Sequence, residues 1–357
     1  MFKRLKMVGS IILALILAAT GCEQMKNQAQ QEQPAKVEEP KPTKGILKVG
    51  YLICNSKEET IERFAASAVY IGQKLGYKIH MYPMNTYEAD EDVKKFGIQV
   101  FKVNSLVYIQ MKHDMDIQMI AGEKRGPKGR FTSGTVVVRK GSPIKTLKDL
   151  KGKKFAFGPQ FAPFGFLVQY DLMLKAGFNP DDVKSGMYYA IPWGANKHEK
   201  AIYNVQAGAY DAGAAPMLDL IHLAETGKIK YGDQYTPEEQ DFEIIAESEP
   251  APYCTFAATK ETDADLVNQV KKALLGLTKN DLAKMDPEWL VVEGFEWDKG
   301  GYLRSGEVLN ITKAAMIDGY EEALDTDYDV LRNMAKNVGM APYDAEEAPG
   351  KPAEVKK

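Results

Sequence analysis

Cysteine and histidine are scarce in this chain, which has three cysteines and four histidines among 357 residues. No CxxC pair and no HExxH motif occurs, so the sequence indicates no zinc site. It also lacks a GxSxG nucleophile elbow, a P-loop and a dinucleotide-binding fingerprint. We therefore expect no metal ion, no cofactor and no enzymatic activity. The catalytic alternative is Cys54 as a nucleophile with His198 as its base.

A surplus of basic residues is absent as well. Lysine and arginine number 46 against 49 aspartates and glutamates, which gives a formal net charge of −3. This balance gives no electrostatic footprint for nucleic acid, so we expect no nucleic-acid partner. It does not exclude an anionic ligand, because local hydrogen-bond donors rather than net charge govern a buried site. Hydrophobic residues make up 45% of the chain, as in globular proteins.

The N-terminus has the features of a secretion signal. The basic residues Lys3, Arg4 and Lys6 precede an apolar run, Ile11–Ala19, which is too short to span a membrane as a stable helix. Small residues then stand directly before Cys22, as in bacterial lipoproteins. We expect a signal peptide at 1–21, a lipid on Cys22 and an extracytoplasmic protein anchored to a membrane, in the periplasm or on the outer face of the cell. The alternative is an uncleaved N-terminal anchor.

Two segments have too few apolar residues to fold. Residues 22–44 are rich in Gln, Glu, Lys and Pro and predict a flexible tether. The tail at 344–357 has the same character. The folded body is therefore expected to occupy about 45–343.

Strand-like and helix-like patterns alternate through this body. Strands are expected at Ile46–Cys54, Lys78–Tyr82, Thr135–Arg139, Lys154–Phe157, Ala209–Ala215, Ile244–Glu247 and Cys254–Thr259. Helices are expected at Glu58–Leu75, Phe166–Ala176, His198–Ala207 and Asp265–Leu277. Gly76, Gly177 and Gly208 follow three of these helices, as C-terminal glycines do. The alternation predicts an α/β protein with parallel sheets covered by helices.

Four segments carry a family resemblance. The stretch from Gly134 to Gly177 contains the element SPIKTLKDLKGK, and Pro250–Lys260 reads as a segment that returns the chain to an earlier lobe. Ile46–Ser56 with the helix after it, and Lys197–Glu199 with the AGAYDA segment that follows, agree with the same pattern. Together they resemble the phosphate, phosphite and phosphonate solute-binding proteins of ABC importers, in a lipoprotein form.

The resemblance implies a two-lobe fold of the type II periplasmic binding protein class. Each lobe would be a mostly parallel sheet flanked by helices, and two crossover strands would join the lobes. Lobe I would comprise 45–134 and 250–343, including C-terminal helices, and lobe II would comprise 135–249. A ligand would lie in the cleft between the lobes, where the carboxyl ends of strands and the N-termini of helices meet.

In the family, a Ser-Thr-Ser-Gly turn after a strand of lobe II grips the phosphonate group. The matching positions here are Ala162, Pro163, Phe164 and Gly165. All three side-chain hydroxyls are missing, although the amides of Phe164 and Gly165 are expected to remain available to an anion. Each lost hydrogen bond to a charged group is worth about 1.5–3 kcal/mol. We therefore expect a small anionic ligand other than phosphate.

Phe161, Phe164 and Phe166 crowd this turn. They either line an aromatic pocket or pack inward as the core of the lobe. The resemblance implies further donors at Asn196, Lys197 and His198, which stand where the family has a second anion-gripping helix start; the alternative is an ordinary solvated helix start. In lobe I, the matching cleft positions are Tyr87, Phe101, Lys102 and Ser105. Lys102 is either the cationic partner of an oxyanion or a surface lysine.

Cys54 and Cys254 are the two cysteines of the body, and both fall at positions near the expected cleft, as does Asn55. Three interpretations stay open. The cysteines are separate buried thiols, or they form a disulfide, or they offer a soft site to a thiophilic ligand.

Two functions share this fold. The first is an uptake receptor that delivers its ligand to an ABC permease and ATPase. The second is a sensory binding protein that docks on a histidine kinase. In either case we expect a monomer that contacts the membrane through its lipid.

Overall fold

The computed structural model describes residues 41–53, 57–126, 128–183, 185–188, 197–278, 280–281, 287–294 and 318–340. The predicted signal peptide, Cys22, most of the tether and the tail lie outside these residues. None of the described helices is both long enough and apolar enough to cross a membrane.

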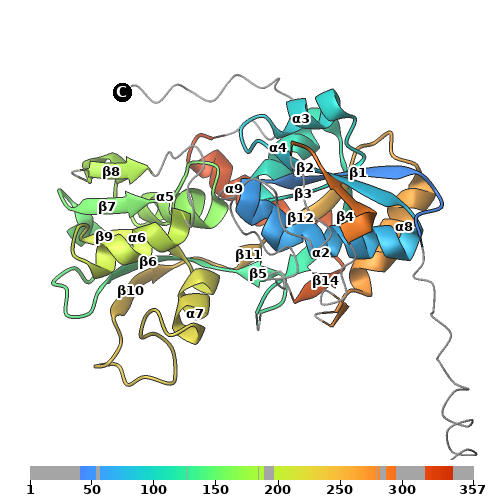
Figure 1. Ribbon diagram of the computed structural model, residues 1–357. Coiled ribbons are helices and arrows are strands. Elements are labelled where there is room, and N and C mark those ends of the chain that lie inside the picture. The colour runs from blue at the N-terminus through green and yellow to red at the C-terminus, as the bar shows by residue number, and fades with distance from the viewer. Residues whose placement is uncertain are drawn as a thin grey trace, which may run out of the picture. The chain divides into compact units, whose positions relative to one another are not determined.

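The elements alternate between strands and helices along the chain (Figure 1). The strands are β1 (Ile46–Leu52), β2 (Lys78–Met84), β3 (Val100–Val103), β4 (Gln118–Lys124), β5 (Phe131–Thr132), β6 (Gly134–Arg139), β7 (Lys154–Phe157), β8 (Ser185–Tyr188), β9 (Ala212–Pro216), β10 (Phe242–Glu247), β11 (Ala251–Pro252), β12 (Thr255–Ala258), β13 (Leu290–Val292) and β14 (Gly319–Glu321). The α-helices are α2 (Lys57–Leu75), α3 (Ala89–Phe96), α4 (Ser105–Met115), α5 (Val168–Lys175), α6 (Lys197–Gln206), α7 (Met217–Glu225), α8 (Ala264–Leu275) and α9 (Asp329–Asn337).

One sheet has seven described strands in the order β13-β2-β1-β3-β12-β4-β14. β13, β2, β1 and β3 pair in parallel, and β12 is antiparallel to both β3 and β4. β1, β3 and β4 therefore run in the same direction, and their carboxyl ends lie at the same edge of the sheet.

Helices cover both faces of this sheet. Buried residues of α2 and α8 pack with Val49, Tyr51 and Phe256 on one face. Those of α3, α4 and α9 pack with Phe101 and Val103 on the other. The alternation of side chains along each strand creates these two cores, because successive residues point to opposite faces.

A second sheet has five described strands in the order β10-β6-β9-β7-β8. β9, β7 and β8 pair in parallel, and β6 is antiparallel to β9 and to β10. Residues of α5 pack on one face beside Phe155 and Phe157, and residues of α6 and α7 pack on the other beside Val137. Each sheet is thus the middle of three layers, which is the predicted α/β architecture.

β5 and β11 pair antiparallel where the chain passes between the two sheets (Figure 1). β5 directly precedes β6, and β11 lies between β10 and β12. The predicted arrangement of two sheets joined by strands that cross between them is confirmed by this topology. Gly76, Gly177 and Gly208 have positive φ angles of 82°, 69° and 80°, so the predicted helix stops are confirmed as well.

Candidate functional site

Charged side chains gather at the carboxyl edge of the seven-stranded sheet. Lys102 is the second-last residue of β3, and Glu123 is the second-last residue of β4. Arg125 follows β4 and shares the face of Ala121 and Glu123, because side chains alternate along a strand. Ala121 belongs to the core under α2 and α8. The charges therefore lie on the α2 side, at the edge where open α/β sheets bind ligands.

These three residues form one buried cluster, which we call the charge cluster. The Glu123 carboxylate is fully buried and pairs through one oxygen with Lys102 Nζ and through the other with Arg125 Nε. Two aromatic rings hold the cations in place: Lys102 Nζ lies 4.1 Å from the centre of the Phe64 ring, and Arg125 Cζ lies 4.5 Å from that of Tyr253. One carboxylate thus stands between two cations.

The pKa values of the cluster follow from these contacts. Burial by itself would raise the pKa of Glu123, but Arg125 and Lys102, with a smaller effect from Arg63 of α2, hold it below its usual value. Burial would lower the pKa of the Arg125 guanidinium, but the Glu123 carboxylate raises it instead. Glu123 and Arg125 are therefore both charged at neutral pH, and the cluster combines one carboxylate with two basic side chains.

The turn predicted to grip the ligand precedes α5, and we call Phe161–Gly165 the aromatic turn. Its last three residues begin a short π-helix, Pro163–Leu167. π-Helical turns occur often at functional sites. The Gly165 carbonyl accepts a 2.6 Å hydrogen bond from the Gly158 amide, and the Phe164 carbonyl accepts one of 2.8 Å from the Gln169 side chain. The backbone of the turn is therefore held from both sides.

One expectation about this turn is wrong. The Gly165 amide donates a 3.3 Å hydrogen bond to the Ala162 carbonyl, so it is not available to an anion. This bond spans three residues, so the chain makes a 3-10-type turn where it enters the π-helix. The Phe164 amide makes no hydrogen bond to another residue of the described chain.

A chain of aromatic and cationic contacts joins the aromatic turn to the charge cluster. The Phe164 ring stacks on Tyr253 with the ring centres 5.8 Å apart and the planes 20° apart. Tyr253 in turn carries Arg125 on its ring. Burial raises the pKa of Tyr253, so its phenol stays neutral. The segment between β11 and β12 thus brings the two predicted halves of the site into contact.

Tyr87 and Phe161 also meet. Their rings pack edge to face with centres 4.7 Å apart, although Tyr87 remains 55% exposed. The Asn104 side chain donates a 3.1 Å hydrogen bond to the Phe161 carbonyl and also caps α4 by accepting from the Val107 amide. Both contacts tie the aromatic turn to residues of the seven-stranded sheet and its connections.

His198 lies against the aromatic turn. A Cβ atom added to Gly165 would stand 2.6 Å from His198 Nδ1, so the ring occupies the space that the glycine leaves. Lys197 begins α6, but its side chain lies outside the description, as do the residues Cys54, Asn55 and Asn196. The three interpretations of the cysteine pair therefore stay hypotheses.

The other predicted contacts are buried. Phe101 is fully buried in the core beside α4, on the sheet face opposite Lys102. Phe166 packs with Phe157 in the core of the five-stranded sheet. Ser105 is fully buried at the first position of α4, and its hydroxyl has no hydrogen-bond partner among the described residues. Cys254 is 5% exposed, and its carbonyl accepts a 2.8 Å hydrogen bond from the Glu123 amide.

Glu123, Arg125 and Tyr253 were not singled out from the sequence. Glu123 and Arg125 stand in the stretch GEKRG, which reads as a polar turn after an apolar strand. Two charges spaced by two residues at a strand end are the signal that could have marked them, since such residues share one face.

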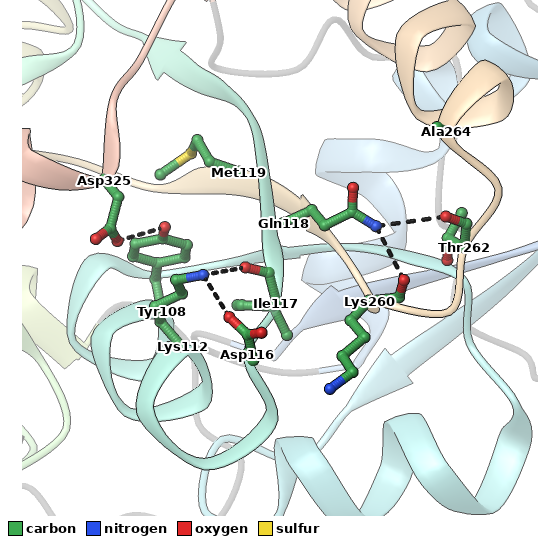
Figure 2. Close-up of a pocket in the computed structure, with 10 residues that line it drawn as sticks. All are labelled: Tyr108, Lys112, Asp116, Ile117, Gln118, Met119, Lys260, Thr262, Ala264 and Asp325. Atoms are coloured by element: carbon green, nitrogen blue, oxygen red, sulfur yellow. Dashed lines mark hydrogen bonds and ion pairs between the residues drawn. The ribbon is translucent and has the colours of Figure 1, made fainter. Parts of the chain in front are cut away.

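A separate surface hollow of about 500 Å³ lies at the other end of β4, around Gln118 (Figure 2). Its polar side chains bind one another: Tyr108 donates to Asp325 at 2.7 Å, and Lys112 to Asp116 at 2.9 Å. The Gln118 amide donates to the Thr259 carbonyl at 3.0 Å. We assign no ligand to this hollow. The described residues also contain no group of three His, Cys, Asp or Glu side chains arranged to hold a metal ion.

Comparisons with known proteins confirm the predicted fold class, a type II periplasmic binding protein-like fold. The family described as the periplasmic substrate-binding protein of phosphonate ABC transporters matches residues 49–328. PhnD1 from Prochlorococcus marinus, solved with methylphosphonate, superposes with a TM-score of 0.59 at 16% identity, over 83% of this chain and 99% of that one. A binding protein component of a phosphonate ABC transporter from Pseudomonas aeruginosa gives 0.57 at 13% identity, over 83% and 87%.

One relative is a sensor protein rather than a transport protein. The tetrathionate sensor histidine kinase TtrS of Salmonella typhimurium is 23% identical over 244 residues, or 64% of this chain. The match covers 39% of the kinase, so the chain spans about two fifths of the length of this relative.

Proposed function

The chain belongs to the periplasmic substrate-binding proteins of phosphonate-type ABC transporters, and we propose that it captures a small anionic solute for an importer. Proteins of this family bind solutes rather than transform them. We propose that the ligand passes from this protein to an ABC permease and its ATPase. The signal peptide at 1–21 and a lipid on Cys22 would keep the protein at the membrane that carries the permease.

One observation carries the proposal: Tyr253 joins the aromatic turn to a buried cluster that has two cations and one carboxylate. A buried positive surplus costs free energy, and a bound anion would offset that cost. We propose that the ligand lies at this junction, between lobe I (45–134 and 250–343) and lobe II (135–249). Tyr87, Phe161, Arg125 and His198 would surround it, and Lys102 and Phe164 would lie buried behind them.

Phosphate itself fits this site poorly. The three positions that carry hydroxyls in the family are Ala162, Pro163 and Phe164, and the Gly165 amide is already used. A strongly hydrated anion would lose its water without gaining enough donors. The site favours an anion that is larger or less polar than phosphate.

Isothermal titration of the purified chain with tetrathionate, methylphosphonate and phosphate tests the proposal. We expect saturable binding of one of the first two anions and weaker binding of phosphate. Native mass spectra recorded beforehand would reveal a ligand that co-purifies. The absence of saturable binding for all three anions, with no co-purified ligand, would contradict the proposal.

A sensory role is the second candidate, and the match to a tetrathionate sensor kinase favours it. In that case the loaded protein would dock on a kinase instead of a permease. Photocrosslinking in native membranes, followed by identification of the captured partner, separates the two roles. Capture of a permease supports import, and capture of a histidine kinase supports sensing.

A further inference from the structure

Arg125 has unused donors. Its Nε donates to Glu123, whereas its two terminal nitrogens have no hydrogen-bond partner among the residues that the structure describes. The side chain is 10% exposed, so one side is packed and a small part stays open. A guanidinium with a free pair of terminal nitrogens is shaped to bind two oxygens of one anion.

We propose that Arg125 is the principal anion-binding residue of the site and that its ligand is a fully ionised oxyanion of the sulfonate or thiosulfonate type. This inference rests on the proposed function, which it narrows to one residue and one class of ligand. Glu123 and Tyr253 are positioning residues: the first fixes Nε, and the second supports the plane of the guanidinium.

Lys102 does not play the same part. Its side chain is 4% exposed, and its ammonium lies between the Glu123 carboxylate and the Phe64 ring. With these two contacts the Lys102 ammonium is enclosed by protein, at the carboxylate oxygen other than the one that pairs with Arg125 Nε. Lys102 therefore contributes charge to the site, and Arg125 makes the contact.

The class of ligand follows from the lack, among the described residues of the site, of a free carboxylate that could accept a hydrogen bond from the ligand. A phosphate or phosphonate that retains a proton must donate it to an acceptor, and both oxygens of Glu123 are already engaged by cations. The aromatic turn supplies no hydroxyl. Burial and, to a smaller extent, the charge of Asp219 of α7 raise the pKa of Tyr253, and no hydrogen bond from Tyr253 to the Asp219 carboxylate is found among the described residues. A sulfonate brings no proton and is weakly hydrated, so it loses less on entering a site lined by Phe164 and Tyr253.

The decisive experiment compares two variants that change the charge equally. Arg125→Gln leaves Glu123 paired with Lys102, and Lys102→Gln leaves it paired with Arg125, so each keeps one balanced pair and should fold. Isothermal titration would use methanesulfonate and methylphosphonate, which have nearly the same shape, together with tetrathionate. Urea unfolding and circular dichroism would confirm that both variants are folded.

We expect the wild type to bind methanesulfonate or tetrathionate at least tenfold more tightly than methylphosphonate. Arg125→Gln should weaken this binding about 100-fold or more, since two hydrogen bonds to a charged group are lost, and Lys102→Gln should weaken it about tenfold or less. Arg125→Lys should bind more tightly than Arg125→Gln but less tightly than the wild type, because lysine keeps the positive charge but lacks the two parallel N–H donors of the guanidinium.

Equal losses in the two Gln variants would overturn the role of Arg125, and preference for methylphosphonate would overturn the ligand class. Both results would leave the proposed function standing, because an anion would still bind. A wild type that binds no anion would refute the proposed function and this inference together.

Discussion

Glu123 is the residue on which the charge cluster depends, because its carboxylate separates two buried cations. A buried pair contributes little net stability when it replaces apolar packing, but breaking it by removing one partner is costly. The same carboxylate holds Arg125 in position, so stability and ligand binding are expected to depend on one side chain.

Glu123→Gln should lower the free energy of unfolding by about 3–5 kcal/mol at pH 7, since Lys102 and Arg125 would stay buried without a counter-charge. The pKa of Glu123 is lower in the folded protein than in the unfolded chain. Its contribution is therefore complete above the unfolded pKa of about 4.3 and is lost as the pH falls through the folded value. Urea unfolding of both proteins should show a gap that narrows below about pH 4.

Glu322→Gln serves as the control. Glu322 pairs with Lys271 at 2.5 Å, but the two side chains are 66% and 33% exposed, and an exposed pair is worth about 0–1 kcal/mol. A loss for Glu123→Gln no larger than that of the control would show that the cluster is not a buried network in solution.

At the scale of elements, each predicted strand and helix is present with bounds that differ by at most a few residues, whereas α3 and α7 are present but not predicted. β7 has the predicted bounds, and three helices end at the predicted glycines. α4 is not predicted, because Leu106 to Met111 are almost all buried and no polar face marks the helical period. β3 and β4 are not predicted either, because β3 is short and β4 is buried over its middle, so neither shows the alternation of apolar and polar residues that marks a strand.

The candidate site shows the same limit. The resemblance locates the aromatic turn, because the turn is one continuous stretch of sequence. The contact of Arg125 with Tyr253 joins segments that are distant along the chain, and only the pairing of β12 with β4 brings them together. No local pattern carries that information.

The aromatic turn itself gives a prediction. Ala162→Ser restores a hydroxyl at the first position of the family's turn, and Ala162 is half-buried, so a small side chain should fit. We expect the affinity for methylphosphonate to rise about tenfold, the worth of one hydrogen bond to a charged group. Titration calorimetry of both proteins measures the change.

Ala176→Ser, at the end of α5, adds the same hydroxyl away from the turn and should leave the affinity unchanged. No gain in methylphosphonate affinity for Ala162→Ser would mean that the turn does not face the ligand, and that the missing hydroxyls do not explain its selectivity.

At the scale of the whole molecule, the junction at Tyr253 couples two separate cores. Buried residues of the seven-stranded and five-stranded sheets form distinct clusters, although Phe164, Leu167 and Val168 pack into the cluster of α4 and α9. A ligand at the proposed junction would touch side chains from the connections of both sheets. Its binding free energy should therefore stabilise both cores at once.

Calorimetric unfolding tests this coupling. A ligand at 100 times its Kd should add about 2.7 kcal/mol to the stability and raise Tm by roughly 3–8 °C, with the entire unfolding transition moving together. At the same ligand concentration, Arg125→Gln should unfold at nearly the same temperature with and without the ligand, and Lys102→Gln should keep about half of the shift or more. If instead the transition split, with one part moving and the other fixed, the ligand would be held by one sheet alone, because only the core that binds it gains stability.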